Sequence, residues 1–200
     1  MYEWRNLTEE QRKEVLLCRA QLHRPWHSPP LVFQAGQFHL SAACYEHQPH
    51  LGYSVKRLAD FAERLLEQMK EAQTPVFAWC LLPNHYHLLV ETRNLKSLKQ
   101  SLGRLHGKTS HEWNLEETTS GRTVWHRCVD RMIRNERHYW ATLNYIHHNP
   151  VYHGYVEQWT DWPFSSAAEF LAQAGRERAV TIWRDYPILD YGKGWDEADL

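Results

Sequence analysis

The residues VFAWCLLPNHYHLLVE, numbered 76 to 91, decide the fold of this chain. They form two apolar runs, 76–82 and 85–91, each with the length of a buried strand. Pro83 and Asn84 separate the two runs, and both residue types are typical of turns. We therefore predict two strands joined by a hairpin turn.

Further predicted elements flank this hairpin on both sides. Apolar residues recur at helical spacing within 54–69 and again from Leu95 toward Trp113. Strand candidates lie at 37–45 and at 124–133, the second after a polar, threonine-rich loop. The resulting order is β-α-β-β-α-β. It predicts an α+β fold with a ferredoxin-like core, in which two helices cover one face of an antiparallel sheet.

One more helix follows this core. It is predicted to begin at Asn135 or Glu136. Pro150 has no backbone N–H to donate and is predicted to end the helix just after Asn149.

Three regions are predicted: an N-terminal helix with a proline-rich linker at residues 1–33, a core domain at 34–150, and a C-terminal extension that packs on the core at 151–200. The first helix begins at a capping box, Thr8 to Gln11, and is expected to run to about Leu22. A short helix is expected at 165–171 within the C-terminal extension.

The composition limits the class of protein. Of the 200 residues, 42% are hydrophobic and 24% charged, which is typical of a globular protein. No apolar run has membrane-spanning length and the N-terminus lacks the apolar centre of a signal peptide, so we expect a cytoplasmic protein. The four cysteines are widely spaced without a C-x-x-C pair. They are better explained as buried thiols than as zinc ligands.

The distribution of charge matters more than the net charge of −1. A net charge near zero argues mildly against a nucleic-acid partner, since phosphate contacts need lysine and arginine. Between Arg93 and Arg137, however, ten lysines and arginines stand against five acids. This segment could bind phosphates, although a solvated surface of mixed sign explains the charges equally well.

His85 and His87 flank Tyr86 on a predicted strand. Alternate strand residues share a face, so the two imidazoles should point the same way and could bind one metal ion, with Tyr86 facing away. Since the chain has 14 histidines, a chance pair on a solvated strand face remains the alternative.

Tyr145 and Asn149 lie four residues apart on the last predicted helix and should share a face. A tyrosine can act as a covalent nucleophile, and the asparagine carbonyl could reach the same metal. The alternative is an aromatic core residue followed by an asparagine helix cap.

Four segments together resemble the REP-associated tyrosine transposases of bacteria: PNHYHLLVE (83–91), WHRCVDRMIR (125–134), YIHHNPVYHG (145–154) and WPFSSA (162–167). These proteins belong to the single-tyrosine transposases with an HUH motif, named for histidine, hydrophobic residue, histidine. The resemblance covers roughly Gln34 to Leu171 and identifies the core, residues 34–150, as an HUH nuclease domain.

The resemblance implies that His85 and His87 bind Mg²⁺ or Mn²⁺, with Asn149 as the third ligand, and that Tyr145 is the nucleophile. The implied activity is that of a single-stranded DNA endonuclease and strand transferase, which forms a 5′-phosphotyrosine and releases a 3′-OH. The implied partner is single-stranded DNA with a hairpin, commonly a repetitive extragenic palindrome (REP). The protein would act near the nucleoid, as a monomer or homodimer, either as a transposase or as a domesticated one.

Further residues are candidates for supporting roles. Those expected to contact DNA are Lys99, Arg104, Lys108, Arg127, Arg131 and Arg134. Trp113 and Trp125 could stack on bases, although core packing is the commoner role of such residues. Asp130 is expected to pair with Arg131 or a neighbouring arginine. His147 and His148 are candidate bases for Tyr145 by sequence proximity alone, and solvent-facing helix positions are the alternative.

Two other functions compete with the nuclease. Histidine-triad hydrolases need a third histidine where this chain has Leu89, which disfavours that class. A non-catalytic DNA- or RNA-hairpin-binding protein derived from a transposase is the stronger alternative.

Overall fold

The computed structural model describes residues 8–10, 13, 17 and 35–192. The chain divides into two units, Met1–Phe33 and Gln34–Leu200. Most of the helix predicted from Thr8 to Leu22, and the linker after it, lie outside the described residues. In the part of the chain that is described, no helix is both long and apolar enough to cross a membrane.

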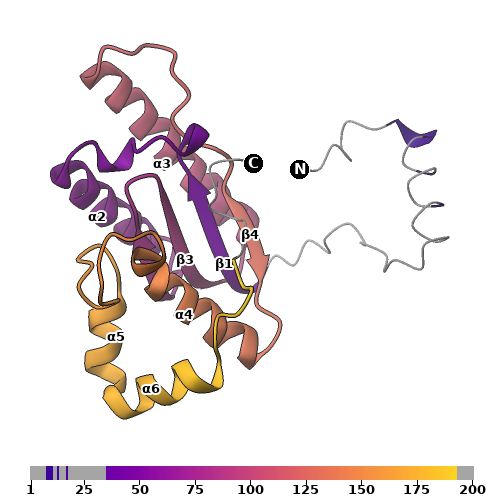
Figure 1. Ribbon diagram of the computed structural model, residues 1–200. Helices are drawn as coiled ribbons and strands as arrows, with labels where there is room; N and C mark the ends of the chain where they lie inside the picture. The colour runs from indigo at the N-terminus through magenta and orange to yellow at the C-terminus, as the bar shows by residue number, and fades with distance from the viewer. Residues whose placement is uncertain (1–7, 11–12, 14–16, 18–34, 193–200) are drawn as a thin grey trace. The chain divides into compact units, whose positions relative to one another are not determined.

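One four-stranded sheet organises the second unit. In sheet order the strands are β2 (Val76–Leu81), β3 (His85–Thr92), β1 (Gly36–Ala43) and β4 (Val129–Met132). All neighbouring strands run antiparallel. With α2 (Val55–Glu71) after β1 and α3 (Leu95–Glu116) after β3, this is the predicted ferredoxin-like arrangement, which is confirmed (Figure 1).

The larger core lies between the sheet and the layer of α2 and α3. Alternate sheet residues pack in this core, namely Phe38, Leu40, Ala42, Tyr86, Leu88 and Val90. Phe61 of α2 contacts the rings of Trp113 and Trp125, with centroids 6.0 and 5.1 Å away. Trp113 is only 6% exposed, and Trp125 is partly exposed and packs against the same core, so core packing is the contact that both tryptophans make.

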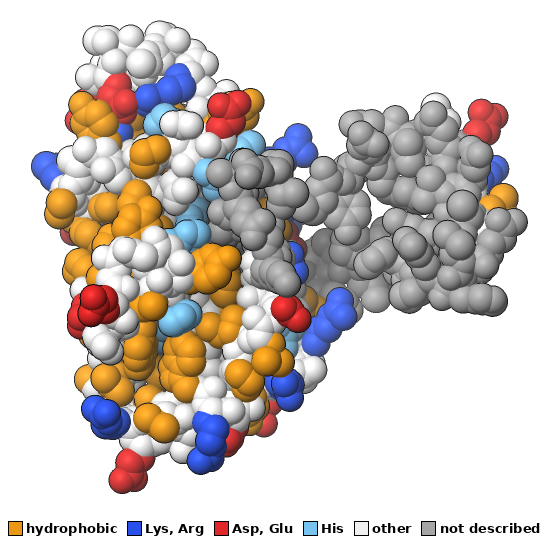
Figure 2. Space-filling view, viewed as in Figure 1, with side chains coloured by type: hydrophobic (Ala, Val, Ile, Leu, Met, Phe, Trp, Pro, Cys, Tyr) orange, Lys and Arg blue, Asp and Glu red, His pale blue; other side chains and the backbone are white. Residues whose placement is uncertain are grey.

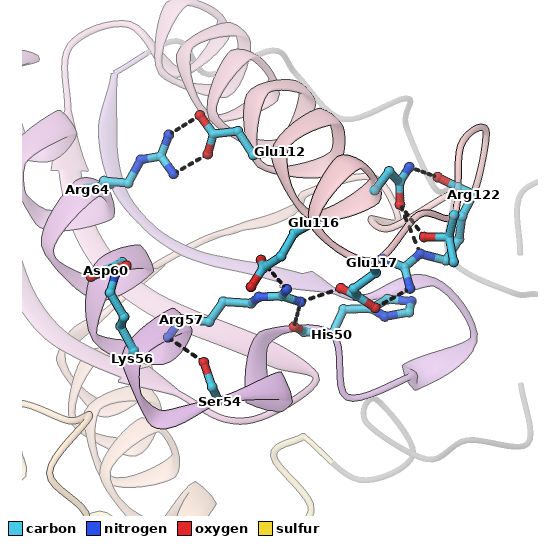
Figure 3. A network of polar contacts seen from close by, with 12 residues as sticks. His50, Ser54, Lys56, Arg57, Asp60, Arg64, Glu112, Glu116, Glu117 and Arg122 are labelled. Carbon is cyan, nitrogen blue, oxygen red and sulfur yellow. Dashed lines mark hydrogen bonds and ion pairs between the residues drawn. The ribbon is translucent and has the colours of Figure 1, made fainter.

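Ion pairs hold the outer ends of α2 and α3 together (Figure 3). Arg57 of α2 is 5% exposed and donates to Glu116 and Glu117 at 2.6 Å each and to the carbonyl of His50 at 3.1 Å. Glu117 also accepts from Arg122 at 2.8 Å. Because Arg57 is buried and fully engaged, this network fixes the helix layer and the loop after α3.

The other face of the sheet is covered by α4 (Glu136–Tyr152), shown in front of the strands in Figure 1. Here the prediction that the helix ends at Asn149 is wrong by about one turn. Pro150 lies in the last turn, where its missing N–H costs a single bond. The backbone N–H of His153 still donates to the Asn149 carbonyl, and that of Tyr155 to the Pro150 carbonyl.

Within its described residues, 151–192, the C-terminal extension contains two helices, α5 (Ala167–Ala174) and α6 (Arg176–Asp185), of which only the first was predicted. Side chains of this extension, Trp162, Phe170, Ile188 and Tyr191, pack against the core beside α4.

Two predicted strands are shorter than expected. β1 ends at Ala43, because Glu46 takes a left-handed backbone (φ 50°) and two short 3₁₀ turns follow, η2 (Tyr45–His47) and η3 (Leu51–Tyr53). In the segment predicted as strand 124–133, only β4 pairs regularly, and Trp125 forms an isolated bridge with Cys44.

Candidate functional site

His85 and His87 of β3 point to the α4 face of the sheet, and each is 1% exposed. Tyr86 points to the opposite face, where its hydroxyl lies 3.1 Å from His106 Nε2. The predicted shared face of the two histidines, with Tyr86 turned away, is therefore confirmed.

The protonation of His85 follows from its neighbour Asn84. The amide nitrogen of Asn84 donates to the His47 carbonyl, so its Oδ1 is the acceptor that lies 2.7 Å from His85 Nδ1. His85 Nδ1 therefore carries the proton, and in the neutral ring the lone pair of Nε2 points toward α4.

Helix α4 brings Tyr145 and Asn149 to the same place. The Asn149 Oδ1 atom lies 2.9 Å from His85 Nε2. The Tyr145 ring lies 5.2 Å from the His87 ring, edge to face. The structure therefore gathers the four predicted residues, two from a strand and two from one helix face, around a single point.

This donor set suits a divalent cation. The neutral His85 Nε2 and the Asn149 carbonyl oxygen both present lone pairs, and 2.9 Å apart they could bind one cation. Adjacent ligands of an octahedral ion at about 2.1 Å lie about 3 Å apart, which matches this separation. Among the described residues no cluster of three or more His, Cys, Asp or Glu has metal-site spacing. The third donor here is an amide.

One residue of the site, His39 of β1, was not predicted from the sequence, because no motif or spacing singles it out. Its Nε2 lies 3.1 Å from His87 Nδ1, and its ring is 5.8 Å from that of Tyr145. His39 is 2% exposed. A contact at Nδ1 orients the His87 ring so that Nε2 is the nitrogen that can bind a metal.

The end of the described chain covers Tyr145, which is 6% exposed. A Cβ on Gly192 would lie 2.1 Å from Tyr145 Cε2, so only glycine fits against this ring. Tyr191 is held beside it, because its hydroxyl lies 2.7 Å from Thr142 Oγ1 and 3.2 Å from His39 Nδ1. Burial raises the pKa of Tyr191 to about 12, so this hydroxyl stays protonated.

The two candidate bases do not serve Tyr145. His147 is fully buried, lies 2.9 Å from the Ser166 hydroxyl and stacks on Trp159. Burial lowers its pKa to about 3, which marks it as a neutral packing residue. His148 packs edge-on against Trp183.

The six predicted DNA-contacting residues do not form one patch. Lys99 and Arg127 line a groove of about 600 Å³ between α3 and residues 122–128. Arg104 lines a separate groove of about 810 Å³ at the other side of α3. The remaining three, Lys108, Arg131 and Arg134, are exposed.

Asp130 pairs with Lys99, whereas the predicted partner was Arg131 or a neighbouring arginine. The reason is the alternation of β4, which turns Asp130 toward α3 and Arg131 to the opposite face. Arg131 stands directly across from His39 in the strand register. Among the six cations, Arg131 is therefore on the same sheet face as Tyr145.

Comparison with known proteins assigns the family. The family model described as "Transposase IS200 like" matches residues 36–149, more than half of the chain, so the protein belongs to this transposase family.

Two curated relatives are REP-associated tyrosine transposases, which confirms the resemblance noted in the sequence. The Escherichia coli K12 protein is 29% identical over 104 residues, covering 51% of this chain and 59% of the relative. The Haemophilus influenzae protein, to which the name is given provisionally, is 33% identical over 99 residues, covering 44% and 56%. The match therefore spans a little over half the length of each relative.

A solved structure of a REP-associated tyrosine transposase bound to a REP hairpin shares the fold. Its TM-score is 0.58 at 19% identity, and the match covers 74% of this chain and 87% of the solved one.

Proposed function

We propose that this chain is a metal-dependent, single-tyrosine endonuclease and strand transferase that acts on single-stranded DNA with REP-like hairpins. The observation that carries the proposal is the position of α4. Its one face brings the Tyr145 ring to 5.2 Å from His87 and the Asn149 carbonyl to 2.9 Å from His85. A nucleophile and three metal-binding side chains thus meet in one site.

His85, His87 and Asn149 are the residues that would hold Mg²⁺ or Mn²⁺. When bound, such an ion polarises the scissile phosphate as a Lewis acid. His39 and Asn84 orient the two imidazoles through their Nδ1 atoms, so that each Nε2 faces the site.

Tyr145 performs the covalent step. Its hydroxyl oxygen attacks the phosphorus and its proton passes to water. The bond from phosphorus to the 3′ oxygen breaks, and the 3′ oxygen takes a proton from water. The products are a 5′-phosphotyrosine and a strand with a free 3′-OH. Since the phosphodiester energy is kept, a 3′-OH can attack the phosphotyrosine and rejoin strands. This chemistry serves a mobile element and a domesticated protein alike.

The proposed partner is a DNA hairpin with unpaired flanking nucleotides, found in the cytoplasm near the chromosome. The names of both relatives and the hairpin in the solved structure support this choice. Arg131 is suited to contact a phosphate beside the site, and the groove lined by Lys99 and Arg127 is suited to the backbone of the stem.

A non-catalytic hairpin-binding protein is the second candidate, and one observation favours it. Tyr145 lies beneath Gly192 and cannot meet a phosphate until residues 190–192 move. The nuclease requires this movement, whereas a binding protein does not.

One experiment separates the two. The full chain is incubated with a labelled library of DNA hairpins with unpaired flanks in Mg²⁺ or Mn²⁺, and the products are run on a denaturing gel. The nuclease predicts a covalent protein–DNA adduct, absent in His85→Ala and His87→Ala, while both variants still bind hairpins. Hairpin binding without an adduct in either metal would establish the binding protein instead.

A further inference from the structure

An aromatic surface begins beside the candidate metal-binding residues. Tyr152 is the last residue of α4, and His153 caps the helix. Tyr152 is seven residues from Tyr145, so these two tyrosines share a helix face. The His153 ring lies 5.0 Å from the His85 ring, edge to face. The surface is thus continuous with the proposed site.

The surface continues through two exposed tyrosine rings. Tyr152 lies 5.1 Å from the His153 ring and is 60% exposed, and Tyr155 lies 6.5 Å from it and is 43% exposed. Gly154 between them adopts a φ of 72°, which permits the sharp turn after α4. Figure 2 shows hydrophobic side chains gathered on this face over α4 and the loop that follows it.

The surface has a rigid backing. The Tyr155 ring packs on Trp162 at 5.3 Å, with the planes 36° apart. Trp162 donates its indole N–H to the Leu81 carbonyl at 2.7 Å, which ties it to the end of β2. Tyr155 is therefore held in place and loses little freedom when a flat ligand stacks on it. The Tyr152 ring has the His153 ring beside it, edge to face.

Charge narrows the choice of ligand. Between Val151 and Ala167 the chain has no lysine or arginine, and it has the acids Glu157 and Asp161. Such a surface does not attract phosphates or an anionic membrane. Nucleobases are the neutral, flat part of single-stranded DNA, and they stack on aromatic side chains.

We propose that Tyr152 and Tyr155 form a stacking platform for the unpaired nucleobases next to the scissile phosphate. The inference rests on the proposed function, since it places a DNA strand at Tyr145. In this arrangement Arg131, on the far side of the site, contacts the DNA backbone, and Tyr152 and Tyr155 contact the bases. A platform of this kind binds unpaired DNA with little sequence preference.

The test measures binding without cleavage. The full chain in EDTA is titrated into a fluorescein-labelled DNA hairpin that carries an unpaired oligothymidine flank on each side, and into the same hairpin with abasic flanks. We expect Tyr152→Ala and Tyr155→Ala each to weaken binding to the thymidine flanks about tenfold. Tyr152→Phe and Tyr155→Phe keep the ring and should bind as the wild type does.

Two controls make the result specific. With abasic flanks, the Tyr→Ala variants and the wild type should bind alike, because no base is left to stack. Tyr53→Ala is the matched control, since Tyr53 is 58% exposed but packs over Arg57 in the helix layer on the other face of the sheet. It should leave both affinities unchanged.

The proposal is overturned if the Tyr→Ala variants bind the thymidine flanks as tightly as the wild type, or lose the same affinity for abasic flanks. A shift from dimer to monomer with unchanged DNA affinity would also overturn it and assign the surface to a second copy. The covalent chemistry is judged separately. If the Tyr→Ala variants lose base stacking but the wild type forms no covalent adduct, the platform is supported and the nuclease activity is rejected. If the wild type forms an adduct but the Tyr→Ala variants bind normally, the nuclease activity is supported and the platform is rejected.

Discussion

His39 Nε2 lies 3.1 Å from Nδ1 of His87, on the neighbouring strand of the sheet. We predict that His39→Phe, which keeps a flat ring but removes both nitrogens, raises the Mn²⁺ concentration needed for half-maximal cleavage by about 10- to 100-fold, as losing the partner of a metal-binding histidine does. Hairpin affinity in EDTA should not change. Unchanged metal dependence would show that His39 does not position His87.

Gly192 packs its backbone on the Tyr145 ring. We predict that Gly192→Val displaces residues 190–192, because a side chain would meet the ring at 2.1 Å, and that the covalent adduct then forms faster than in the wild type. Gly121→Val is the control, since its Cβ would meet nothing within 4 Å and its positive φ carries a similar backbone strain. A slower reaction in Gly192→Val would mean that the segment belongs to the active arrangement.

Arg127 lines the groove beside α3, and Arg131 of β4 stands across from His39; both are exposed. We predict that hairpin affinity falls steeply with salt despite the net charge of −1. Arg127→Gln and Arg131→Gln should each reduce the slope of log affinity against log salt by about 0.7 to 0.9, the value for one phosphate contact. Arg178→Gln, an exposed position on α6, should leave the slope unchanged. A wild-type affinity that does not respond to salt would remove DNA phosphates as partners.

Glu117 should make stability depend on pH. Its hydrogen bonds to Arg122 and Arg57 lower its pKa from 4.5 to about 2. The ionised form is therefore stabilised in the folded state above pH 4.5, and that stability is lost as pH falls from 4.5 toward 2. Urea unfolding should show Glu117→Gln less stable than the wild type at pH 6, by on the order of 2 kcal/mol after allowing for solvent screening. The difference should shrink toward pH 2. A difference that stays constant with pH would contradict this role.

The sequence predicted the parts of the molecule that depend on local periodicity. The strand alternation of HYHLLVE placed His85 and His87 on one face, and the spacing of Tyr145 and Asn149 placed them on one helix face. Whether two residues share a face depends only on whether the segment is a strand or a helix. Both predictions therefore hold even though the predicted helix end at Asn149 was wrong by about one turn.

The remaining features of the site depend on which elements are neighbours. His39 meets His87 only because β1 lies between β3 and β4, and one histidine among 14 carries no sign of that. Asp130 pairs with Lys99 because β4 turns it toward α3. The cover over Tyr145 comes from Gly192, almost fifty residues further along the chain, and no local pattern predicts such a contact.

The central claim is that Tyr145 is the nucleophile, and mapping the covalent adduct tests it most directly. The full chain is reacted with a cleavable hairpin in Mn²⁺, digested with protease and nuclease, and analysed by mass spectrometry, beside Tyr145→Phe and the control Tyr139→Phe. We predict a nucleotide on Tyr145 in the wild type and in Tyr139→Phe. The Tyr145→Phe protein should be folded, bind the hairpin and carry no adduct. An adduct on any other residue, or cleavage by Tyr145→Phe at the wild-type rate, would contradict the account.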